Sequence, residues 1–350
     1  MKNTLKRIKT QKAKVKFSLF TFYFLLFTFY FLVVQGCNKT SRTPVKWPGA
    51  VSVGSLVPEA TRIIRKGLAD VDPDVRVNAI EVVATTRRIK LMPDVQQLLE
   101  ADFAPRVGFA AALAVGDTEY HLAERSIKPL LKDEDENIRI AAAYAMGKLG
   151  STNSFELLRK AIAGDDQIVR ANAAFLLGKS GDKSALKFLY IALRRKDSDE
   201  IVRFNAAEAI ARIGDRWIFP KLWTMLISSY HDDRVFGIGA MGALGTPKAK
   251  EVLITMLDDD VPEVRLAAAE QLGMLGDTTG EPEVLDVFRK NLAAGLHKDD
   301  LERLNARTAM AIGQIGTPAL TRFLPRLLHN ESKFVRIAAA KAVFQCATKE

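Results

Sequence analysis

One short pattern recurs along most of the chain at a nearly constant distance. Acidic residues precede a branched aliphatic residue and an arginine, alanines follow, and in the strong copies a glycine stands eleven places after the arginine, as in "DDQIVRANAAFLLGKSG" at 165–181. The nine anchor positions are Arg76, Arg106, Arg139, Arg170, Arg203, Arg234, Arg265, Asn305 and Arg336. Successive anchors are 30 to 40 residues apart, a period that is typical of repeat proteins.

Each unit is predicted to hold two helices. In the seventh unit, apolar residues recur at helical spacing over 252–257 and again over 264–275. The acidic residues between the two stretches are good helix N-caps, and the closing glycine suits the left-handed residue after a helix end. A single pair of helices cannot bury its apolar stripe alone, so the pairs must stack. We therefore predict an all-α fold, an α-α superhelical solenoid of about nine helix pairs over residues 58–350.

These units resemble the HEAT-like repeats first recognised in phycobilisome lyases, and the resemblance covers roughly residues 58–350. It implies the fold, but it says little about activity, because the same architecture serves scaffolds, lyases, metalloenzymes and DNA glycosylases.

The amino-terminal segment is typical of a secretory signal. Residues 1–16 hold seven basic and no acidic residues, and residues 17–34 carry no charge. The sequence Val34-Gln35-Gly36-Cys37 resembles the bacterial lipobox, which implies that Cys37 is acylated and becomes the first residue of the mature chain. The apolar run approaches the ~20 residues that span a bilayer. An uncleaved membrane anchor, or a structural role for Cys37, therefore stays open as an alternative.

This interpretation divides the chain into three parts. We expect a lipoprotein signal peptide at 1–36, a flexible tether at 37–57 and the HEAT-repeat solenoid at 58–350. The tether is polar and contains prolines and glycines without helical periodicity. Asn38 follows the cysteine where enteric bacteria use Asp to retain lipoproteins in the inner membrane. The resemblance thus favours the outer membrane of the cell envelope if the host has one, and otherwise the plasma membrane.

The charge of the chain changes when the leader is removed. The net charge is +10, with 51 basic and 41 acidic residues, and seven of the basic residues lie in the leader. The remaining 44 basic residues nearly balance the acidic ones. Nine phenylalanines and tyrosines also lie in the apolar run at 17–34, which leaves few aromatic residues for stacking on bases. We therefore expect no nucleic-acid partner.

The sequence contains no recognisable catalytic motif. None of its four histidines, His121, His231, His297 and His329, is followed by glutamate or belongs to an HExxH motif. Cys346 has no intramolecular disulfide partner if Cys37 is acylated, and we interpret it as a packed small apolar residue, with a reactive thiol as the alternative. We predict no catalytic residue, no metal, no cofactor and no small-molecule substrate.

Two features of the second helices are candidate binding groups. The repeated arginines are expected to form an intramolecular ladder with the turns, and the alternative is a basic stripe for an acidic partner. Asn78, Asn172 and Asn205 stand two places after an anchor arginine. In the related armadillo solenoids, inner asparagines hold the backbone of an extended peptide, since an amide both donates and accepts. The alternative is that each amide satisfies the backbone of its own unit.

The segment "DRWIFPKLWTML", residues 215–226, is the second candidate. Trp217 and Trp223 are large enough to serve as hot spots for a partner. Helical spacing assigns Leu222, Met225 and Leu226, together with Phe219, to the core, so the question is whether a tryptophan is exposed.

Two irregularities have structural consequences. The interval between the seventh and eighth anchors is 40 residues, and its extra residues around 278–300 are expected to lengthen the first helix or a loop at one rim. The last unit ends in "VFQCATKE" without a polar outer helix, so that end of the solenoid needs a cover or a partner.

These observations favour a membrane-anchored, non-enzymatic HEAT-repeat lipoprotein that acts as a protein-binding scaffold in the bacterial cell envelope. Its partners would be an envelope protein or peptide and, through the lipid anchor, the membrane. A lyase-like enzyme and a purely structural spacer are the alternatives.

Overall fold

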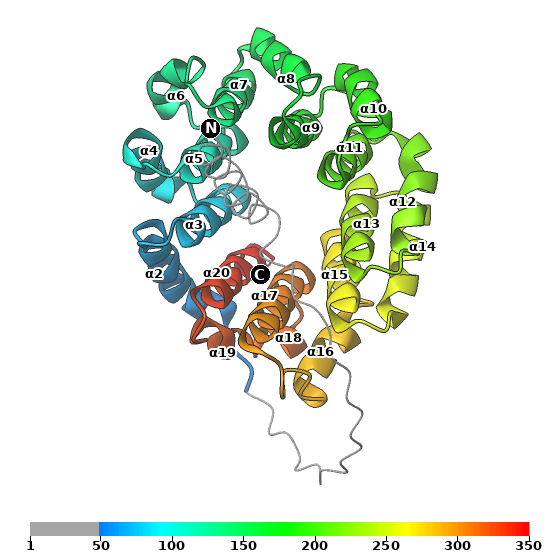
Figure 1. Ribbon diagram of the computed structural model, residues 1–350. Coiled ribbons are helices and arrows are strands. Elements are labelled where there is room, and N and C mark those ends of the chain that lie inside the picture. Colours follow the sequence, from blue (N-terminus) through cyan, green and yellow to red (C-terminus); the bar gives the residue numbers. More distant parts are fainter. Residues whose placement is uncertain (1–48, 350) are drawn as a thin grey trace, which may run out of the picture. The chain divides into compact units, whose positions relative to one another are not determined.

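The computed structural model describes residues 49–349, which belong to one compact unit, Pro48–Glu350 (Figure 1). The predicted signal peptide, Cys37 and most of the predicted tether lie outside the described residues. Helical structure begins at Val53, within the segment predicted as tether, and Val53 is buried. No helix within 49–349 combines the length and the apolar character needed to cross a membrane.

The described residues form nine helix pairs and contain no strand. The first helices are α2 (Val57–Leu68), α4 (Met92–Ala101), α6 (Glu124–Leu130), α8 (Phe155–Ala161), α10 (Leu186–Arg194), α12 (Phe219–Leu226), α14 (Pro247–Thr255), α16 (Glu281–Arg289), and α18 (Pro318–Thr321) with α19 (Leu324–Leu328). The second helices are α3 (Pro73–Thr85), α5 (Pro105–Thr118), α7 (Glu136–Lys148), α9 (Gln167–Ser180), α11 (Glu200–Arg212), α13 (His231–Leu244), α15 (Pro262–Met274), α17 (Lys298–Ile315) and α20 (Lys333–Ala347). The predicted all-α repeat solenoid is confirmed.

Short 3₁₀ turns precede or extend several of the first helices. They are η1 (Val53–Leu56), η2 (Ile89–Leu91), η3 (His121–Ala123), η4 (Thr152–Ser154), η5 (Lys183–Ala185), η6 (Arg216–Ile218) and η7 (Met256–Asp258).

The ends of the second helices follow the local chemistry of the repeat. The carboxylates of the N-cap residues Asp72, Asp135, Asp166 and Asp199 accept hydrogen bonds from the first turns of their helices. The glycine eleven places after the anchor has a positive φ in six units: Gly150, Gly181, Gly214, Gly245, Gly276 and Gly316. Glycine adopts this backbone conformation without the steric cost that a Cβ brings. The repeated acid and glycine therefore set where each second helix begins and ends.

Small residues allow adjacent second helices to pack closely. A Cβ at Gly178 of α9 would lie 2.6 Å from the Cα of Ala209 in α11. Alanines are the commonest buried residues along α5, α7 and α11. Second helices of neighbouring units thus pack side by side, while each first helix packs on the second helix of its own unit.

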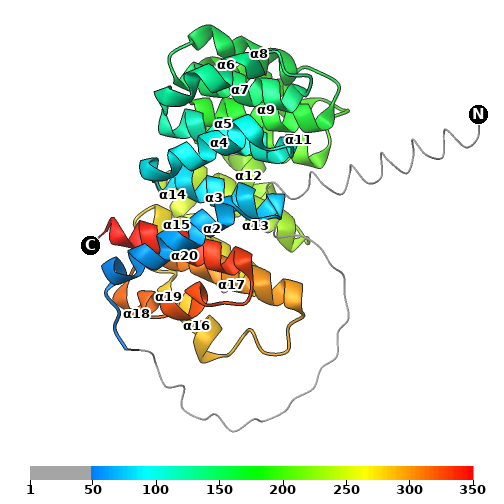
Figure 2. The same ribbon diagram turned by 90° about the vertical axis from the view of Figure 1, so that its left-hand side faces the viewer.

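The unit Pro48–Glu350, taken by itself, closes into a ring. In Figure 1 the second helices line the inside of the ring and the first helices form the outside. The last helix, α20, packs against α2 and α3 of the first unit, and both views place these helices side by side (Figures 1 and 2). The last unit does have a cover, as its sequence requires, and that cover is the first unit of the same chain.

We call this junction the seam. Lys333 Nζ lies 2.8 Å from Asp70 Oδ2, and Lys341 Nζ lies 3.0 Å from Glu81 Oε1. The Arg88 guanidinium stacks 3.9 Å from the centre of the Phe344 ring. Polar and apolar groups from both ends of the chain therefore hold the ring closed.

Of the two places expected for the extra residues of the eighth unit, the structure confirms the loop and not the first helix. The first helix of that unit, α16, has nine residues, whereas the second helix, α17, has 18. The turn that joins them runs from 290 to 297. The insertion thus lengthens the turn and the start of the second helix rather than the first helix.

Candidate interaction surface

The anchor arginines point back into the turns of the repeat. Six of them donate from the guanidinium to the carbonyl oxygen six residues earlier, and Arg203 donates more weakly to carbonyls seven and eight residues earlier: Arg76 to Asp70, Arg139 to Asp133, Arg170 to Gly164, Arg234 to Ser228, Arg265 to Asp259, Arg336 to Asn330, and Arg203 to Lys196 and Arg195. The intramolecular ladder expected from the sequence is therefore present, and these groups are not a free basic stripe.

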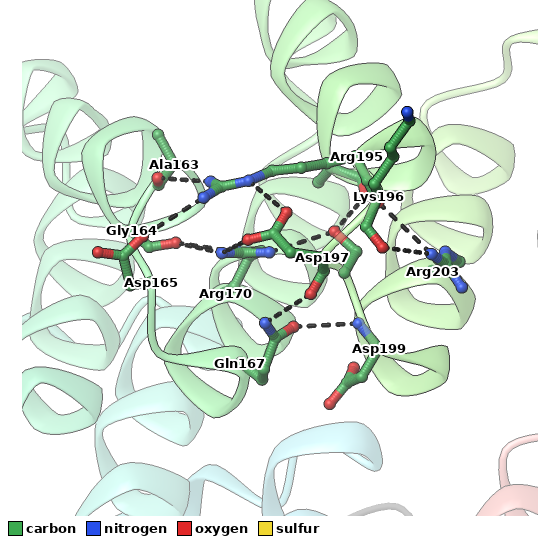
Figure 3. A network of polar contacts seen from close by, with 12 residues as sticks. Ala163, Gly164, Asp165, Gln167, Arg170, Arg195, Lys196, Asp197, Asp199 and Arg203 are labelled. Atoms are coloured by element: carbon green, nitrogen blue, oxygen red, sulfur yellow. Dashed lines mark hydrogen bonds and ion pairs between the residues drawn. The ribbon is translucent and has the colours of Figure 1, made fainter.

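Arg170 is the most deeply buried member of the ladder, with no exposed surface. Figure 3 shows its polar contacts. Its guanidinium donates to Gly164 O at 2.6 and 3.0 Å and lies 3.3 Å from the Asp197 carboxylate. The side chain of Gln167 links the same turns, because it donates to Asp197 O and accepts from the Asp199 N–H. The network fixes the turn of unit four against that of unit five.

The three candidate asparagines do not form one peptide-binding row. Asn78 Nδ2 donates to Asp74 O in its own helix at 2.7 Å, and Asn172 Nδ2 donates to Asn137 Oδ1 of α7 at 2.8 Å. Asn205 is half-exposed and makes no side-chain hydrogen bond within 49–349. Two of the three amides are thus used inside the protein, and whether any of them contacts a partner stays a prediction.

Charged groups on the inner helices are also paired with one another. Asp117 of α5 accepts from the Tyr144 hydroxyl at 2.6 Å and from Lys179 of α9 at 2.7 Å. Burial, and then the Asp117 charge, raise the pKa of Tyr144, which therefore stays protonated. The inner surface consequently has its polar groups directed at one another.

His231 and Cys346 both contact neighbouring groups of the protein. His231 begins α13 and lies 2.7 Å from the carboxylate of Asp232, whose hydrogen bond raises the pKa of His231. Cys346 is buried, and its thiol faces the carbonyl oxygens of Ile312 and Gly313. Within the part of the chain that the structure describes, no three His, Cys, Asp or Glu side chains come together as a set of metal ligands.

Both candidate tryptophans are exposed on the outer side of unit six. Trp217 in η6 is 88% exposed, and Trp223 in α12 is 43% exposed. Leu222, Met225 and Leu226 of the same segment are buried, as their spacing predicts, whereas Phe219, which the same spacing assigned to the core, is half-buried. The inward side of α12 therefore forms core, and Trp223 stands on the outward side.

The exposed apolar surface extends beyond the tryptophans. Ile191 of α10 is 62% exposed, Ile227 at the end of α12 is 67% exposed, and Ile254 of α14 is also exposed. We define the outer face of units 5–7 by the exposed apolar residues Ile191, Trp217, Trp223, Ile227 and Ile254 and by the exposed basic residues Lys183, Lys187, Arg216, Lys221 and Lys248.

The first helices of units six and seven have apolar residues at an outward position where units two and four have polar residues. Trp223 and Ile254 stand twenty residues after the anchor of the preceding unit, and Gln96 and Arg159 hold the equivalent positions. Gln96 Nε2 donates to Ser126 Oγ and to Glu100, and Arg159 pairs with Asp182 at 2.5 Å. The outward position is thus polar and internally bonded in units two and four, and apolar and open in units six and seven.

A second exposed apolar pair lies in the turns of units one and two. Phe103 is fully exposed and Val71 is 91% exposed. Arg76 connects the two turns, because it donates to Val71 O and to the Asp102 carboxylate. We found no signal for this pair in the sequence, since a single apolar residue in a turn has no periodic context.

Part of the chain matches known repeat families. Residues 155–237 and 228–295 match HEAT repeats, and residues 138–164 match the PBS lyase HEAT-like repeat. A HEAT repeat-containing taxis protein of Halobacterium salinarum is 37% identical over 82 residues, which is 23% of this chain and 18% of the length of that relative.

Two solved structures with low sequence identity to this chain align with most of its length. Human deoxyhypusine hydroxylase is 16% identical with a TM-score of 0.37, over 76% of this chain and 99% of that one. The CpcE–CpcF complex of phycocyanin lyase from Nostoc sp. PCC7120 is 19% identical with a TM-score of 0.40, over 71% of this chain and 93% of that one. Because these sequence identities and TM-scores are low, neither similarity indicates what this chain binds. The matched segments carry HEAT repeats, and the described residues on either side of them form helix pairs of the same all-α repeat fold.

Proposed function

We propose that this chain is a lipid-anchored, non-enzymatic scaffold of the bacterial cell envelope that binds a protein partner. The observation that carries the binding role is the outer face of units 5–7. Exposed Trp223 and Ile254 there replace the polar residues that occupy the equivalent positions in units two and four. Exposed aromatic residues on a rigid support are the usual centres of protein interfaces.

The inner surface supports a scaffold rather than an open groove. Asp117 accepts hydrogen bonds from both Tyr144 and Lys179, and Lys341 is paired with Glu81. A partner that bound to these groups from inside the ring would have to compete with these contacts, and the desolvation of each charge would oppose it. We therefore place the partner on the outside of the ring.

The lipid anchor rests on the sequence around Cys37. Acylation there would tether the repeats to the membrane through about 20 residues and raise the local concentration of the scaffold near envelope partners. Intact mass and membrane fractionation of the wild type and of Cys37→Ala in a bacterial host test this part. We expect a mature chain that begins at acylated Cys37 and a mutant that is not processed. An unmodified, full-length wild-type chain would contradict the lipoprotein assignment.

The double variant Trp217→Ala/Trp223→Ala tests the binding role. We expect it to lose the protein partners that chemical crosslinking captures from the envelope, with only a small decrease in melting temperature, because Trp217 is 88% exposed and Trp223 is 43% exposed. The matched control is Gln97→Ala/Lys128→Ala, which alters exposed residues of the first helices of units two and three. Equal capture by both variants would favour the structural spacer instead.

A further inference from the structure

We infer that the segment that docks on the outer face of units 5–7 is acidic, a stretch of a protein partner that carries Asp and Glu beside apolar residues. This inference rests on the proposed function and names the chemistry of its partner. It follows from the distribution of charge on the outer face.

The first helices of units five and six carry basic residues and no acidic residue. Over 183–194 the charged residues are Lys183, Lys187 and Arg194, and over 216–226 they are Arg216 and Lys221. The Lys and Arg side chains that belong to the outer face of units 5–7 are all exposed, and none forms an ion pair with another residue of 49–349. In units five and six the outer face of units 5–7 therefore presents positive charge without ion-pair partners next to its apolar residues, whereas α14 of unit seven also carries the exposed Glu251.

Two other basic side chains on the outer helices, unlike those of the outer face of units 5–7, are paired with carboxylates. Arg159 of α8 pairs with Asp182 at 2.5 Å, and Lys250 of α14 pairs with Asp277 at 2.8 Å. The Lys250 ammonium, with Thr279, lowers the pKa of Asp277 to about 2. The repeat can therefore supply a carboxylate to an outer cation, and it supplies none to Lys187 or Lys221.

Aromatic rings hold two of these cations in place. Lys187 Nζ lies 4.8 Å from the centre of the Phe188 ring, and Lys248 Nζ lies 4.5 Å from the centre of the Phe219 ring. A cation over a ring keeps its charge available to a carboxylate while losing less side-chain freedom when the carboxylate binds. Basic groups positioned among exposed apolar residues are thus prepared for an acidic, partly apolar segment.

The curvature of the ring favours a protein over a lipid surface. Nine units that close a ring turn by about 40° each on average, so the outer helices of three successive units do not share one plane. A flat membrane would reach only part of the apolar set that runs from Ile191 through Trp223 to Ile254. A polypeptide can follow the curved side.

The apolar contacts of the tryptophans and the charge contacts of the basic residues should affect binding in different ways. Burial of the tryptophans supplies most of the affinity, whereas complementary charge supplies specificity and faster association. Reversal of the basic charge should therefore weaken capture and remove its salt dependence. The fold should be preserved because neither Lys187 nor Lys221 forms an ion pair within 49–349, and Lys187 loses only its contact with the Phe188 ring.

Site-specific photocrosslinking tests the inference on the full chain in a bacterial host. Benzoylphenylalanine replaces Ile191, and the same probe at Gln97 of α4 is the control. Mass spectrometry then identifies what is joined to residue 191. We expect peptides with an excess of Asp and Glu, and a loss of about tenfold in adduct yield in Lys187→Glu/Lys221→Glu. The charge control is Lys66→Glu/Lys128→Glu, at exposed lysines of α2 and α6, which should not change the yield.

Three outcomes would overturn the inference. Adducts that survive charge reversal but disappear in Trp217→Ala/Trp223→Ala would leave the proposed function standing and show that the partner is not acidic. Phospholipid adducts at residue 191 would mean that the outer face of units 5–7 rests on the membrane. Adducts no more abundant than at Gln97 would remove both the inference and the proposed binding site.

Discussion

At the scale of single residues, the anchor arginine of seven units connects sequence, turn and packing. The anchor arginine follows the acidic turn by a fixed distance, and its guanidinium returns to the carbonyl oxygen of that turn. Since each guanidinium holds five donors in a fixed plane, one side chain can bond the turn of its own unit and the next unit at once. Arg234 does so, because it reaches both Ser228 O and the Asp259 carboxylate.

Arg170→Leu should lower the free energy of unfolding by about 3 kcal/mol, because it leaves buried polar groups of two turns without their donor. The matched control is Arg203→Leu, whose guanidinium makes longer bonds of 3.3 and 3.5 Å to its turn and should cost about 1 kcal/mol. Chemical denaturation measures both. An Arg170 variant as stable as the wild type would mean that the ladder does not stabilise the ring.

At the scale of helices, spacing predicted where the helix pairs lie and which sides they bury. It did not decide whether Trp223 is exposed, because one apolar residue beside a buried stripe fits either the core or the surface. Ile191 and Ile254 were missed for the same reason. Only the angle of each first helix on its second helix decides which apolar residues face outward, and that angle depends on packing between units rather than on local pattern.

Two glycines test how closely the second helices must approach. Gly178→Ala should destabilise the protein by about 1–3 kcal/mol, since the new Cβ would meet the Ala209 backbone. Gly239→Ala in α13, where nothing lies within 4 Å of the new Cβ, should stabilise it by about 0.5–1 kcal/mol, because alanine favours a helix. Thermal unfolding compares the two. A Gly178 variant more stable than the wild type would show that α9 and α11 separate without cost.

At the scale of the whole unit, the closure of the ring could not be read from the repeat period. The spacing of anchors fixes the number of units, but closure depends on the small rotation between neighbouring units, summed over nine interfaces. The sequence did indicate that the last unit lacks a polar outer face. It could not indicate that α2 and α3 would cover that face, because contacts between residues more than 250 positions apart leave no local signal.

The seam closes the solenoid into a ring. The stability of this ring should therefore depend on charge pairs between the two ends of the chain. The Lys341 ammonium lowers the pKa of Glu81, and the hydrogen bond from Lys333 lowers the pKa of Asp70. A carboxyl group with a lowered pKa stabilises the folded state above its ordinary pKa, and this contribution is lost as the pH falls through the lowered value. The seam should therefore weaken in acid, below about pH 4.

A charge exchange across the seam tests this expectation. Lys341→Glu should lower the melting temperature at neutral pH, because it faces Glu81, and Glu81→Lys in the same chain should restore most of the loss. The expected cost of the single variant is about 1 kcal/mol, since Glu81 is partly exposed to solvent. As the pH falls through the lowered pKa of Glu81 and this carboxyl group is neutralised, the difference between wild type and single variant should shrink. A loss that the second substitution does not repair would mean that the two ends are not joined through this pair.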